Sequence, residues 1–384
     1  MVKVIELSPT MGNGGAETLI KDYALLADAG KIDMRVVTWC GTLGSANEEH
    51  LAKAGIQIVH LEELRYAKGA TLNPLQRVHR KIGRFIDFRR YIIKEQPDVI
   101  HIHLRFGGYI RMLPLRKLNV RLFYTVHNEL EQYFDKRPFS KKWLEYCEAR
   151  RLIRKYSMTM VTLHEDMNRS IRKYFNTDRV VTVHNGVNLA RFKNELYDRN
   201  ATRDLLGIDR DVTLLGHVGS VHTQKNHEMI IDIYEEYLKK DATARLLLVG
   251  KGNKKKEIKE LIEAKGLTEK VVFLEDRTDV PALMNAMDVF VMPSRWEGYP
   301  VVLIEAQSLG LPCVVSDRIT NECVLTDKIA MLSIEDSATK WCDVIEAAAK
   351  DKIAFMTHCM KPVANVEDYD IVSSIRTLEK MYMA

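Results

Sequence analysis

Two glutamates separated by seven residues lie in the run PSRWEGYPVVLIEAQSLGLPCVVSD, residues 293–317. Glu297 is expected on a loop. Glu305 falls inside a helix that is predicted to begin at Pro300, because proline suits the first helical position, where its missing N–H costs nothing. Gly310 suits a left-handed residue just past the helix, and Pro312 prevents continuation. The sequence therefore predicts a loop carboxylate, a short helix with a second carboxylate, and then a buried strand.

The start of this predicted helix is a candidate anion site. Unpaired N–H groups near residues 300–303, together with the helix dipole, favour a phosphate. Glu305 would lie roughly 7.5 Å along the axis, at about 1.5 Å per residue, which is about the separation of a diphosphate and a ribose diol. Val301 and Val302 are apolar, so Glu305 is expected to be partly buried. The pattern favours a sugar nucleotide, and the alternative is a surface loop with an ordinary helix.

Two glycine-containing loops could bring backbone amides close to a phosphate or a sugar. Gly14 and Gly15 precede a predicted helix, although a plain tight turn is the alternative. Lys225 ends the run GHVGSVHTQK, residues 216–225, where its ammonium could neutralise a leaving diphosphate. The alternative is a solvated lysine at a helix start. Neither loop has the dinucleotide fingerprint, so an NAD-dependent oxidoreductase is the least favoured enzyme class.

Three histidines follow or occupy predicted strands. His127 comes directly after the strand 121–126, at the end where open parallel sheets bind ligands. By its position alone, a single histidine there is more often a structural hydrogen-bonding residue. His101 and His103 alternate with isoleucines, so they are expected to face a sheet surface or the edge of a cleft. No catalytic role is assigned to them.

The stretch 293–317 resembles the Glu-x7-Glu signature of the retaining family-four glycosyltransferases. The resemblance extends from about residue 8 to the C-terminal helix and is most specific between residues 216 and 317. It implies the α/β GT-B fold, with two doubly wound Rossmann-like domains facing across a cleft. It also implies transfer of a sugar from a nucleotide-sugar, with a UDP-sugar favoured, to a glycan or lipid-linked acceptor in surface polysaccharide or capsule biosynthesis. The expected enzyme is a hexosyltransferase.

The resemblance implies roles for individual residues. The leaving phosphate would help to deprotonate the acceptor, so no protein nucleophile is expected. The catalytic residues are expected to be His127, Lys225 and Glu297. The donor-binding residues are expected to be Gly14, Gly15, Gly219, Ser220, Lys225, Glu297, Gly298, Tyr299, Pro300, Val301, Val302 and Glu305.

One position departs from the family pattern. Ser220 stands where the family usually has an arginine, whereas Lys225 is kept. Stabilisation of the leaving group would then depend more on Lys225 and helix amides, or on another arginine such as Arg105 or Arg277. Ser220 leaves open an alternative function, a catalytically weak GT-B subunit that binds a partner or a glycan. A separate alternative on the same fold is a nucleotide-sugar epimerase, which needs no acceptor.

The alternation of short β-branched runs with helical patterns predicts parallel sheets flanked by helices. The first domain is predicted at 1–187, with the C-terminal helix 364–384 packing back on it by resemblance. The second, which binds the nucleotide-sugar, is predicted at 188–363. Strands are expected at 2–7, 34–39, 56–60, 99–103, 121–126, 158–163 and 180–183, and then at 213–218, 245–249, 271–274, 289–292 and 313–316. Helices are expected at 16–29, 74–96, 141–156, 165–175 and about 369–383.

A basic stretch runs from residue 65 to residue 94, with apolar residues interleaved. It predicts either a helix whose basic face is solvated or a patch that contacts anionic lipid headgroups or a lipid-linked phosphate. Nucleic acid is a poorer interpretation, because the aromatic residues follow the period of a helix core. The residues of this basic patch are Arg77, Arg80, Lys81, Arg84, Arg89 and Arg90.

The composition limits the remaining classes. The chain has 384 residues, a net charge of +5 and six scattered cysteines with no CxxC pair. This favours a reduced, cytoplasmic protein with neither disulfides nor a zinc site. No DxD motif stands at a plausible strand end, so no cofactor and no metal are expected. No run of about 18 apolar residues occurs, so any contact with the inner membrane surface is expected to be peripheral.

Overall fold

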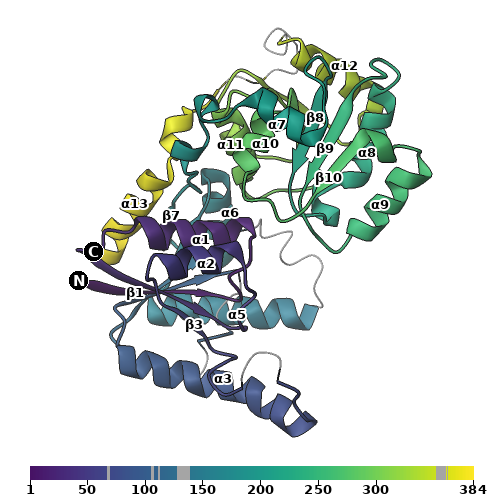
Figure 1. Cartoon of the computed structure of the whole chain (residues 1–384). Coiled ribbons are helices and arrows are strands. Elements are labelled where there is room, and N and C mark those ends of the chain that lie inside the picture. Colours follow the sequence, from purple (N-terminus) through teal and green to yellow (C-terminus); the bar gives the residue numbers. More distant parts are fainter. Residues whose placement is uncertain (67–69, 105–107, 111–112, 128–138, 352–359, 361) are drawn as a thin grey trace. The chain divides into compact units, whose positions relative to one another are not determined.

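The computed structural model describes residues 1–66, 70–104, 108–110, 113–127, 139–351, 360 and 362–384. The chain folds as two compact units (Figure 1). Unit 1 comprises Met1–Gly186 and Ile371–Ala384, and unit 2 comprises Val187–Asp370. Each is a helix-flanked parallel sheet, as expected from the alternation of strand and helix patterns.

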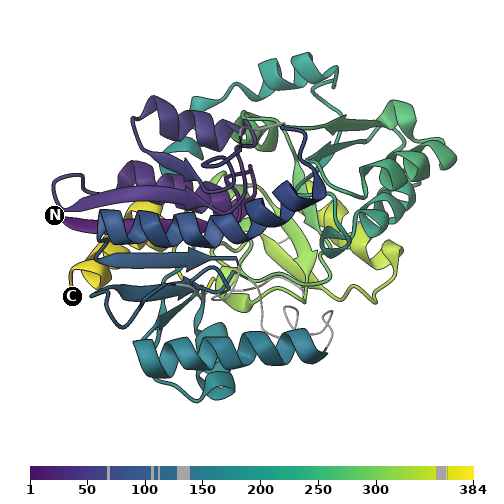
Figure 2. The same ribbon diagram turned by 90° about the horizontal axis from the view of Figure 1, so that it is seen from below.

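Unit 1 is built on a seven-stranded sheet in the order β3-β2-β1-β4-β5-β6-β7. Helices α1 and α13 cover one face, and α3 and α5 lie along the other (Figures 1 and 2). The strands are β1 Val2–Ser8, β2 Ile32–Thr38, β3 Ile58–His60, β4 Val99–His103, β5 Arg121–Thr125, β6 Thr159–Thr162 and β7 Val180–Thr182. The helices are α1 Gly15–Leu26, α2 Ala46–Lys53, α3 Pro74–Glu95, α5 Phe139–Tyr156, α6 Glu165–Phe175 and α13 Ile371–Met383.

Unit 2 repeats this order with six strands, β10-β9-β8-β11-β12-β13. Its core forms where α8 and α12 pack on one face of the sheet. The strands are β8 Leu214–Val218, β9 Arg245–Val249, β10 Val271–Leu274, β11 Val289–Met292, β12 Cys313–Ser316 and β13 Ile329–Leu332. The helices are α7 Arg199–Leu206, α8 His227–Tyr237, α9 Lys255–Ala264, α10 Val280–Asn285, α11 Val301–Ser308 and α12 Ala338–Ala349.

Both sheets have all-parallel pairings, so their inner strands are covered on both sides and their sequences are almost continuously apolar. The strand register shows how the polar residues within these apolar strands are placed relative to one another. Glu6 pairs with His101 across β1 and β4, and His103 pairs with Thr125 across β4 and β5. Paired residues point to the same face. All four therefore lie on the face that also carries Val4 and the residues of α1 and α13.

The predicted domain limits differ from the observed ones. Residues 364–370 were expected with the first domain, and Val187 was too, but both belong to unit 2. Packing explains the difference: the ring of Tyr369 stacks on Tyr299 with centroids 5.7 Å apart, and its hydroxyl donates to the Glu322 carbonyl at 3.2 Å. Val187 forms a bridge with Asp370. Only the helix α13 returns to unit 1.

Strand β13 and helices α2, α7, α8, α9, α10 and α12 were given no predicted range. Strand β13 has the sequence IAML, which lacks the β-branched run that marks the other strands. Helix α2 is mostly polar and buries only three of its residues, so its apolar period is weak. A local signal was nevertheless present, because Ser45 caps α2 and forms a reciprocal capping box with Glu48.

Candidate active site

In unit 2 the predicted site residues follow strands at which the connections reverse direction. In unit 2, β8 and β11 are neighbours, and the chain leaves them toward opposite edges of the sheet. Open parallel sheets bind ligands at the carboxyl ends of such strands. Lys225 follows β8 and Glu297 follows β11. In unit 1, β1 and β4 hold the equivalent position, so the Gly14 loop and His103 lie at the corresponding edge.

The structure brings Lys225 and Glu297 into direct contact. Lys225 Nζ donates to Glu297 Oε1 at 2.6 Å, and Gln224 Nε2 donates to Oε2 at 3.1 Å. The two charged side chains are only 12% and 6% exposed. Asn226, in a left-handed conformation, ties the two loops together by donating to the Pro293 carbonyl at 3.1 Å. An ammonium and a carboxylate are therefore held side by side at this edge of the sheet.

The helix after Glu297 begins one residue later than predicted. Pro300 is the N-cap of α11, not its first residue, and among the described residues no side chain caps this end. A proline cannot supply a capping side chain, so the first amides of α11 are left for another partner. The predicted residues Val301 and Val302 provide two of these amides. Gly310 has φ +65°, which confirms the predicted left-handed residue after the helix.

Glu305 lies in the second turn of α11 and is half-buried, as expected from its apolar neighbours. Gly298 is buried beside Glu297. Tyr299 is also buried, but its hydroxyl donates to the Glu322 carbonyl at 3.3 Å. Its ring stacks on Tyr369 within unit 2. The side chain of Tyr299 therefore packs in unit 2, and any part it takes in binding a donor must come through its backbone.

The glycine positions after β8 and β9 are sterically required. A Cβ on Gly219 would lie 2.9 Å from His217 Nε2 and 3.2 Å from Lys225 Cε. Gly250, which the sequence analysis did not single out, has φ +152°, and a Cβ there would lie 1.9 Å from the Gly219 carbonyl oxygen. A Cβ added at either position would displace the loop that carries Lys225.

The position of the missing arginine is solvent-exposed. Ser220 has an exposed side chain. Of the two arginines considered as substitutes, Arg277 forms an ion pair with Asp279 at 2.5 Å, and Arg105 lies outside the described residues. Lys225 therefore remains the cation with a defined place beside Glu297.

In unit 1, side chains at the start of α2 hold the glycine loop by hydrogen bonds. Gly14 caps α1, and Gly15 is its first residue. Asn47 Nδ2 donates to the Gly12 carbonyl at 2.7 Å, and Ser45 donates to the Met11 carbonyl. A Cβ on Gly14 would lie 2.5 Å from a carboxylate oxygen of Glu17. The loop after β1 is thus a turn held in place by side chains at the start of α2.

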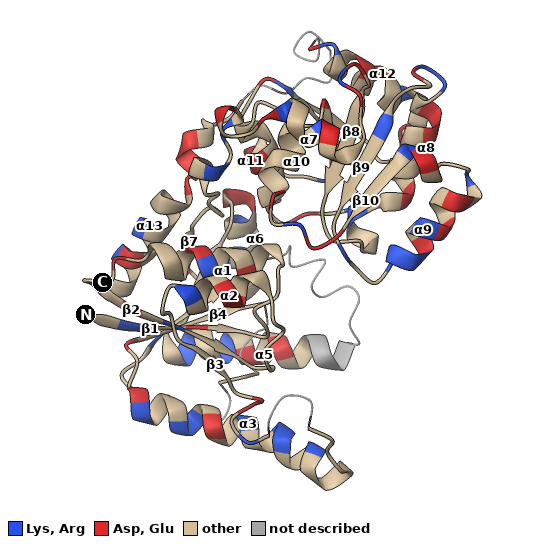
Figure 3. Ribbon diagram, viewed as in Figure 1, with Lys and Arg blue, Asp and Glu red and all other residues tan. Residues whose placement is uncertain are grey.

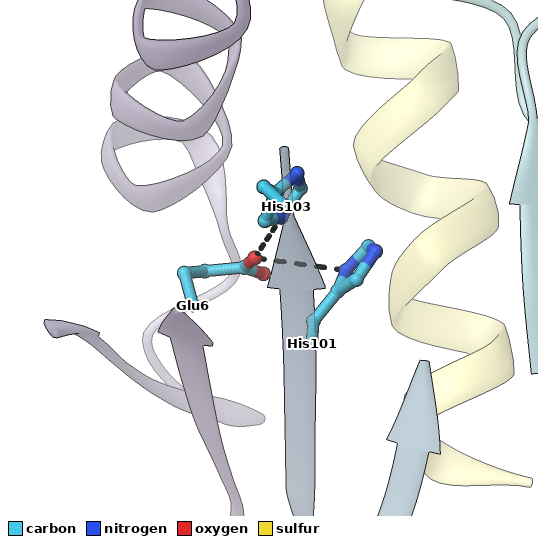
Figure 4. Close-up of side chains that lie close together, drawn as sticks. All are labelled: Glu6, His101 and His103. Carbon is cyan, nitrogen blue, oxygen red and sulfur yellow. Dashed lines mark hydrogen bonds and ion pairs between the residues drawn. The ribbon is translucent and has the colours of Figure 1, made fainter. Parts of the chain in front are cut away.

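His101 and His103 point to a face of the sheet, one of the two expected positions, but helices cover that face and both side chains are completely buried. Glu6, which was not singled out from the sequence, is also completely buried and lies beside them (Figure 4). His103 Nε2 lies 2.6 Å from Glu6 Oε2, and His103 Nδ1 lies 3.0 Å from Nε2 of the half-buried His127. The signal that could have found them is a charged residue inside VKVIELS, an otherwise apolar strand.

The remaining polar groups of this cluster are paired as well. Tyr382, on α13, donates to Glu6 Oε1 at 3.1 Å and lies 2.5 Å from His101 Nδ1. His101 Nε2 lies 2.7 Å from Thr125 Oγ1. The C-terminal helix therefore contributes a hydrogen-bonding group to the centre of unit 1, and does not merely cover an apolar face.

Burial and hydrogen bonding set the charges in this cluster. Burial opposes ionisation of Glu6, but electrostatic attraction from the neighbouring His101 and His103 and the hydrogen bond from His103 outweigh it, so the pKa of Glu6 lies well below its usual range. Burial lowers the pKa of His103 to about 4. Burial, with His103 and His101 nearby, also lowers the pKa of His127 well below the usual histidine value. At neutral pH, His103 and His127 are neutral and Glu6 is ionised.

Glu6, His101 and His103 also have the geometry of a possible metal site, since one ligand atom from each lies within 4.8 Å of the others. Carboxylate and imidazole groups are ordinary zinc ligands. However, each of these atoms already has a hydrogen-bond partner in the folded chain. The hydrogen bonds of these three side chains are therefore satisfied within the folded chain.

The basic patch divides into anchored and exposed members. Arg84 donates to the Trp39 carbonyl at 3.2 Å and lies over the Trp39 ring, so it fastens α3 to the sheet instead of extending outward. Arg80 pairs with Glu62 at 3.2 Å, and Arg90 approaches Asp87 at 3.9 Å. The exposed members are Arg77, Lys81, Arg89 and Arg90.

Exposed apolar side chains accompany this patch on the N-terminal half of α3, along which basic residues are frequent (Figure 3). Leu75 is 82% exposed, and Val78 and Ile82 are more than half exposed. Their spacing places them on neighbouring turns of the helix. Within the described ranges, no helix is both long and apolar enough to cross a membrane.

Two family models match the chain and between them span most of it. The model "Glycosyltransferase Family 4" matches residues 13–191, and "Glycosyl transferases group 1" matches residues 198–362. EpsF of Bacillus subtilis (strain 168), named as a glycosyltransferase, is 27% identical over 390 residues, covering 99% of this chain and 96% of EpsF. The UDP-Gal:alpha-D-GlcNAc-diphosphoundecaprenol alpha-1,3-galactosyltransferase of Escherichia coli is 26% identical over 311 residues, 78% of each protein.

Solved structures show the same fold. The Anabaena protein HepE, crystallised in complex with UDP-glucose, superposes with a TM-score of 0.77 at 17% identity, covering 100% of both chains. WaaG, a glycosyltransferase involved in lipopolysaccharide biosynthesis, superposes with a TM-score of 0.72 at 17% identity, again over 100% of both. The predicted α/β class and the predicted resemblance are both confirmed. The chain belongs to the family-four glycosyltransferases and has their GT-B fold of two Rossmann-like domains.

Proposed function

We propose that this glycosyltransferase moves a sugar from a UDP-sugar to a glycan or lipid-linked acceptor in surface polysaccharide biosynthesis, with retention of anomeric configuration. The names of its relatives support this choice of substrates. The similar E. coli enzyme is named for UDP-Gal and a diphosphoundecaprenol acceptor, and HepE was crystallised with UDP-glucose. Both kinds of substrate carry a diphosphate, which a cation and free helix amides can bind.

The observation that carries the proposal is the contact between Lys225 and Glu297 at the edge where α11 begins. A donor diphosphate placed at the first amides of α11 would take over the ammonium of Lys225. Glu297 would then accept hydrogen bonds from hydroxyls of the transferred sugar. Glu305, in the second turn of α11, would accept them from the ribose diol. The diphosphate would thus meet a cation and N–H donors, and the hydroxyls of each sugar would meet a carboxylate that accepts their hydrogen bonds.

The proposed chemistry follows a front-face path. The acceptor oxygen bonds to the anomeric carbon as the bond between that carbon and the phosphate oxygen breaks, and a phosphate oxygen takes the acceptor's hydroxyl proton. Lys225 and the amides of α11 stabilise the negative charge that grows on the leaving diphosphate. The proposal needs neither a nucleophile from the protein nor a divalent metal ion.

Contact with a membrane surface would follow from the basic patch and the apolar residues beside it. Leu75, Val78 and Ile82 could enter the boundary between headgroups and acyl chains, while Arg77 and Lys81 contact anionic headgroups. Such a contact would bring the enzyme to an acceptor that is fixed to a lipid.

The donor is tested by measuring the melting temperature with UDP, GDP and ADP and with their sugars. Ligand at about 100 times its dissociation constant stabilises the folded state by about 2.7 kcal/mol, which shifts the melting curve measurably. We expect the largest shift with UDP or a UDP-sugar and the loss of most of it in Glu305→Ala. Glu346→Ala is the matched control, because that glutamate lies on α12 in exposed ion pairs.

The same samples separate the enzyme from the alternative of a weak or inactive binding subunit. Hydrolysis or transfer from a UDP-sugar that disappears in Glu305→Ala supports the enzyme. A shift with UDP without turnover, under conditions that include a lipid-linked acceptor, supports a binding subunit in which the exposed Ser220 fails to replace an arginine. If none of the nucleotides changes the melting temperature, the donor site is wrong.

A further inference from the structure

We propose that Glu6 and His103 are positioning residues that determine which nitrogen of His127 carries the proton, so that Nδ1 of His127 accepts a hydrogen bond from a substrate hydroxyl. This inference rests on the proposed transferase function and adds a proton arrangement to it. It starts from three side chains in a row: Glu6 Oε2 is 2.6 Å from His103 Nε2, and His103 Nδ1 is 3.0 Å from His127 Nε2.

The proton positions follow from what each group can do. An ionised carboxylate only accepts, so Nε2 of His103 must carry a proton and donate it to Glu6. A neutral imidazole carries one N–H, so Nδ1 of His103 is an acceptor. The hydrogen bond between the two rings then requires Nε2 of His127 to donate. Burial lowers the pKa of His127, so its imidazole is neutral. Nδ1 of His127 is therefore left with a lone pair.

The rest of the cluster reinforces this direction. Tyr382 donates to the second oxygen of Glu6, so the carboxylate receives one hydrogen bond on each oxygen. His101 Nδ1 is 3.6 Å from Glu6 Oε2, which is too long for a hydrogen bond. His101 instead pairs with Tyr382 and Thr125. His103 is therefore the imidazole hydrogen-bonded to Glu6.

The location argues against a purely structural role. Burying a carboxylate and two imidazoles in a sheet face that is otherwise apolar is costly, and well-packed apolar residues of similar volume are often at least as stable. The cluster lies at the carboxyl ends of β1 and β4, the edge at which the Gly14 loop also lies. Its only half-buried imidazole is that of His127, the predicted catalytic histidine.

The consequence concerns substrate recognition. A histidine fixed in this tautomer accepts a hydrogen bond from a sugar or acceptor hydroxyl and cannot donate one through Nδ1. A substrate in which that hydroxyl is replaced by fluorine or by a methyl ether would lose the interaction. No proton leaves the row of side chains during the reaction, so Glu6 and His103 act only by orienting His127.

The tautomers can be read directly by two-bond 15N–1H correlation spectra of the full-length protein labelled at histidine. We expect Nε2–H signals for both His103 and His127 throughout pH 6 to 8, assigned with His103→Gln and His127→Gln. An Nδ1–H tautomer or a charged imidazolium at His127 in this range would overturn the proposal. This measurement needs no substrate, so it separates failure of the proposed proton arrangement from failure of the transferase assignment.

Metal analysis of the same sample tests the alternative that Glu6, His101 and His103 bind a zinc ion. A zinc ion on Glu6, His101 and His103 would occupy Nε2 of His103 and move its proton to Nδ1, so the row would run in the opposite direction. Stoichiometric zinc together with an Nδ1–H tautomer at His127 would therefore show a metal site and overturn the proposed proton arrangement. Protein without zinc and with Nε2–H tautomers supports the proposed arrangement.

Two substitutions at His103 test the effect on turnover. His103→Gln keeps a donor for Glu6 and an acceptor for His127, whereas His103→Leu removes both. We expect kcat to fall roughly 100-fold in the leucine variant with little change in donor KM, and to recover most of its value in the glutamine variant. Thr125→Val is the matched control, because it removes a partner of His101 and leaves the row intact.

The controls keep the outcome interpretable. The UDP-induced melting shift should be unchanged in all three variants, because Lys225, Glu305 and the first amides of α11, which are proposed to hold the UDP group, lie in unit 2. Equal losses in the leucine and glutamine variants, or a leucine variant with full activity, would contradict the proposal. If the leucine variant fails to fold, the tautomers of the wild type and the kcat of the glutamine variant still decide the question.

Discussion

The two units share one strand order but use the same edge of the sheet in different ways. In unit 1 the polar groups next to the central strands are buried, paired with one another and, for His103 and His127, neutral. In unit 2 an ammonium and a carboxylate face each other beside an uncapped helix end. The doubly wound topology therefore supplies the place for a site, and the side chains decide its chemistry.

The difference suggests a division of work. Neutral imidazoles held in a fixed direction are suited to orienting hydroxyl groups, because their hydrogen bonds are directional and change little with salt. A cation beside helix amides is suited to stabilising the charge of a leaving diphosphate. The following experiments test this contrast, beginning with the largest expected effect.

The carboxylates of unit 2 should be essential for turnover. We expect Glu297→Ala to lower kcat/KM for the UDP-sugar roughly 1,000-fold, about 4 kcal/mol in the barrier, because the sugar hydroxyls and Lys225 both lose their partner. Steady-state transfer assays measure this loss, with Glu346→Ala as the control on α12. A loss smaller than tenfold would remove Glu297 from the site.

The pair in unit 2 should also behave as a buried ion pair. Removing one member leaves the other charge without its main partner, which costs about 3 kcal/mol. Urea unfolding of Lys225→Met should show this loss, and Lys225→Met/Glu297→Gln should recover much of it. Lys240→Met, whose partners are exposed, should lose less than about 1 kcal/mol. Equal effects of the two lysine substitutions would show that Lys225 is not specially buried.

The neutral histidines should make the protein sensitive to mild acid. The pKa of His103 is lowered to about 4 in the folded state, so between pH 6.5 and 4 the unfolded chain binds more protons. The free energy of unfolding therefore falls as the pH drops through this window, by on the order of 2 kcal/mol for this group. His227 in unit 2, whose pKa burial also lowers to about 4, adds a loss of the same sign.

Unfolding curves from pH 7 to pH 4.5 measure this dependence. His103→Gln cannot titrate, so its stability should decline less steeply than that of the wild type. A slope identical to the wild type would mean that His103 is already charged in the folded protein.

The smallest expected effect concerns the membrane. Ile82→Asp should weaken binding to vesicles of phosphatidylglycerol and phosphatidylcholine roughly tenfold, because an exposed apolar side chain becomes a repelled charge. Co-sedimentation at low and moderate salt measures this, and Leu205→Asp, at an even more exposed apolar site on α7, is the control. Equal retention of both variants would leave α3 as a solvated helix.

The sequence predicted most of the fold because its signals are local. Seven strands of the first sheet and the strands β8 to β12 followed from β-branched runs between helical patterns. Strand β13 and helix α2 were missed, since their apolar patterns are weak. No ranges were predicted for helices α7, α8, α9, α10 and α12 of unit 2. The Glu-x7-Glu run likewise placed Glu297 and Glu305 around a helix start, because a proline, a glycine and seven intervening residues fix that geometry locally.

The sequence by itself determined the family, the two doubly wound sheets and the residues that surround α11, because each depends on neighbours along the chain. Only the tertiary structure decided the partners. Glu6, His103, His127 and Tyr382 come from three strand ends and the last helix, and residues 369 and 370 proved to belong to unit 2. Sequence spacing carries no information about which side chains meet across parallel strands, since strand order and register are set by packing of the whole sheet.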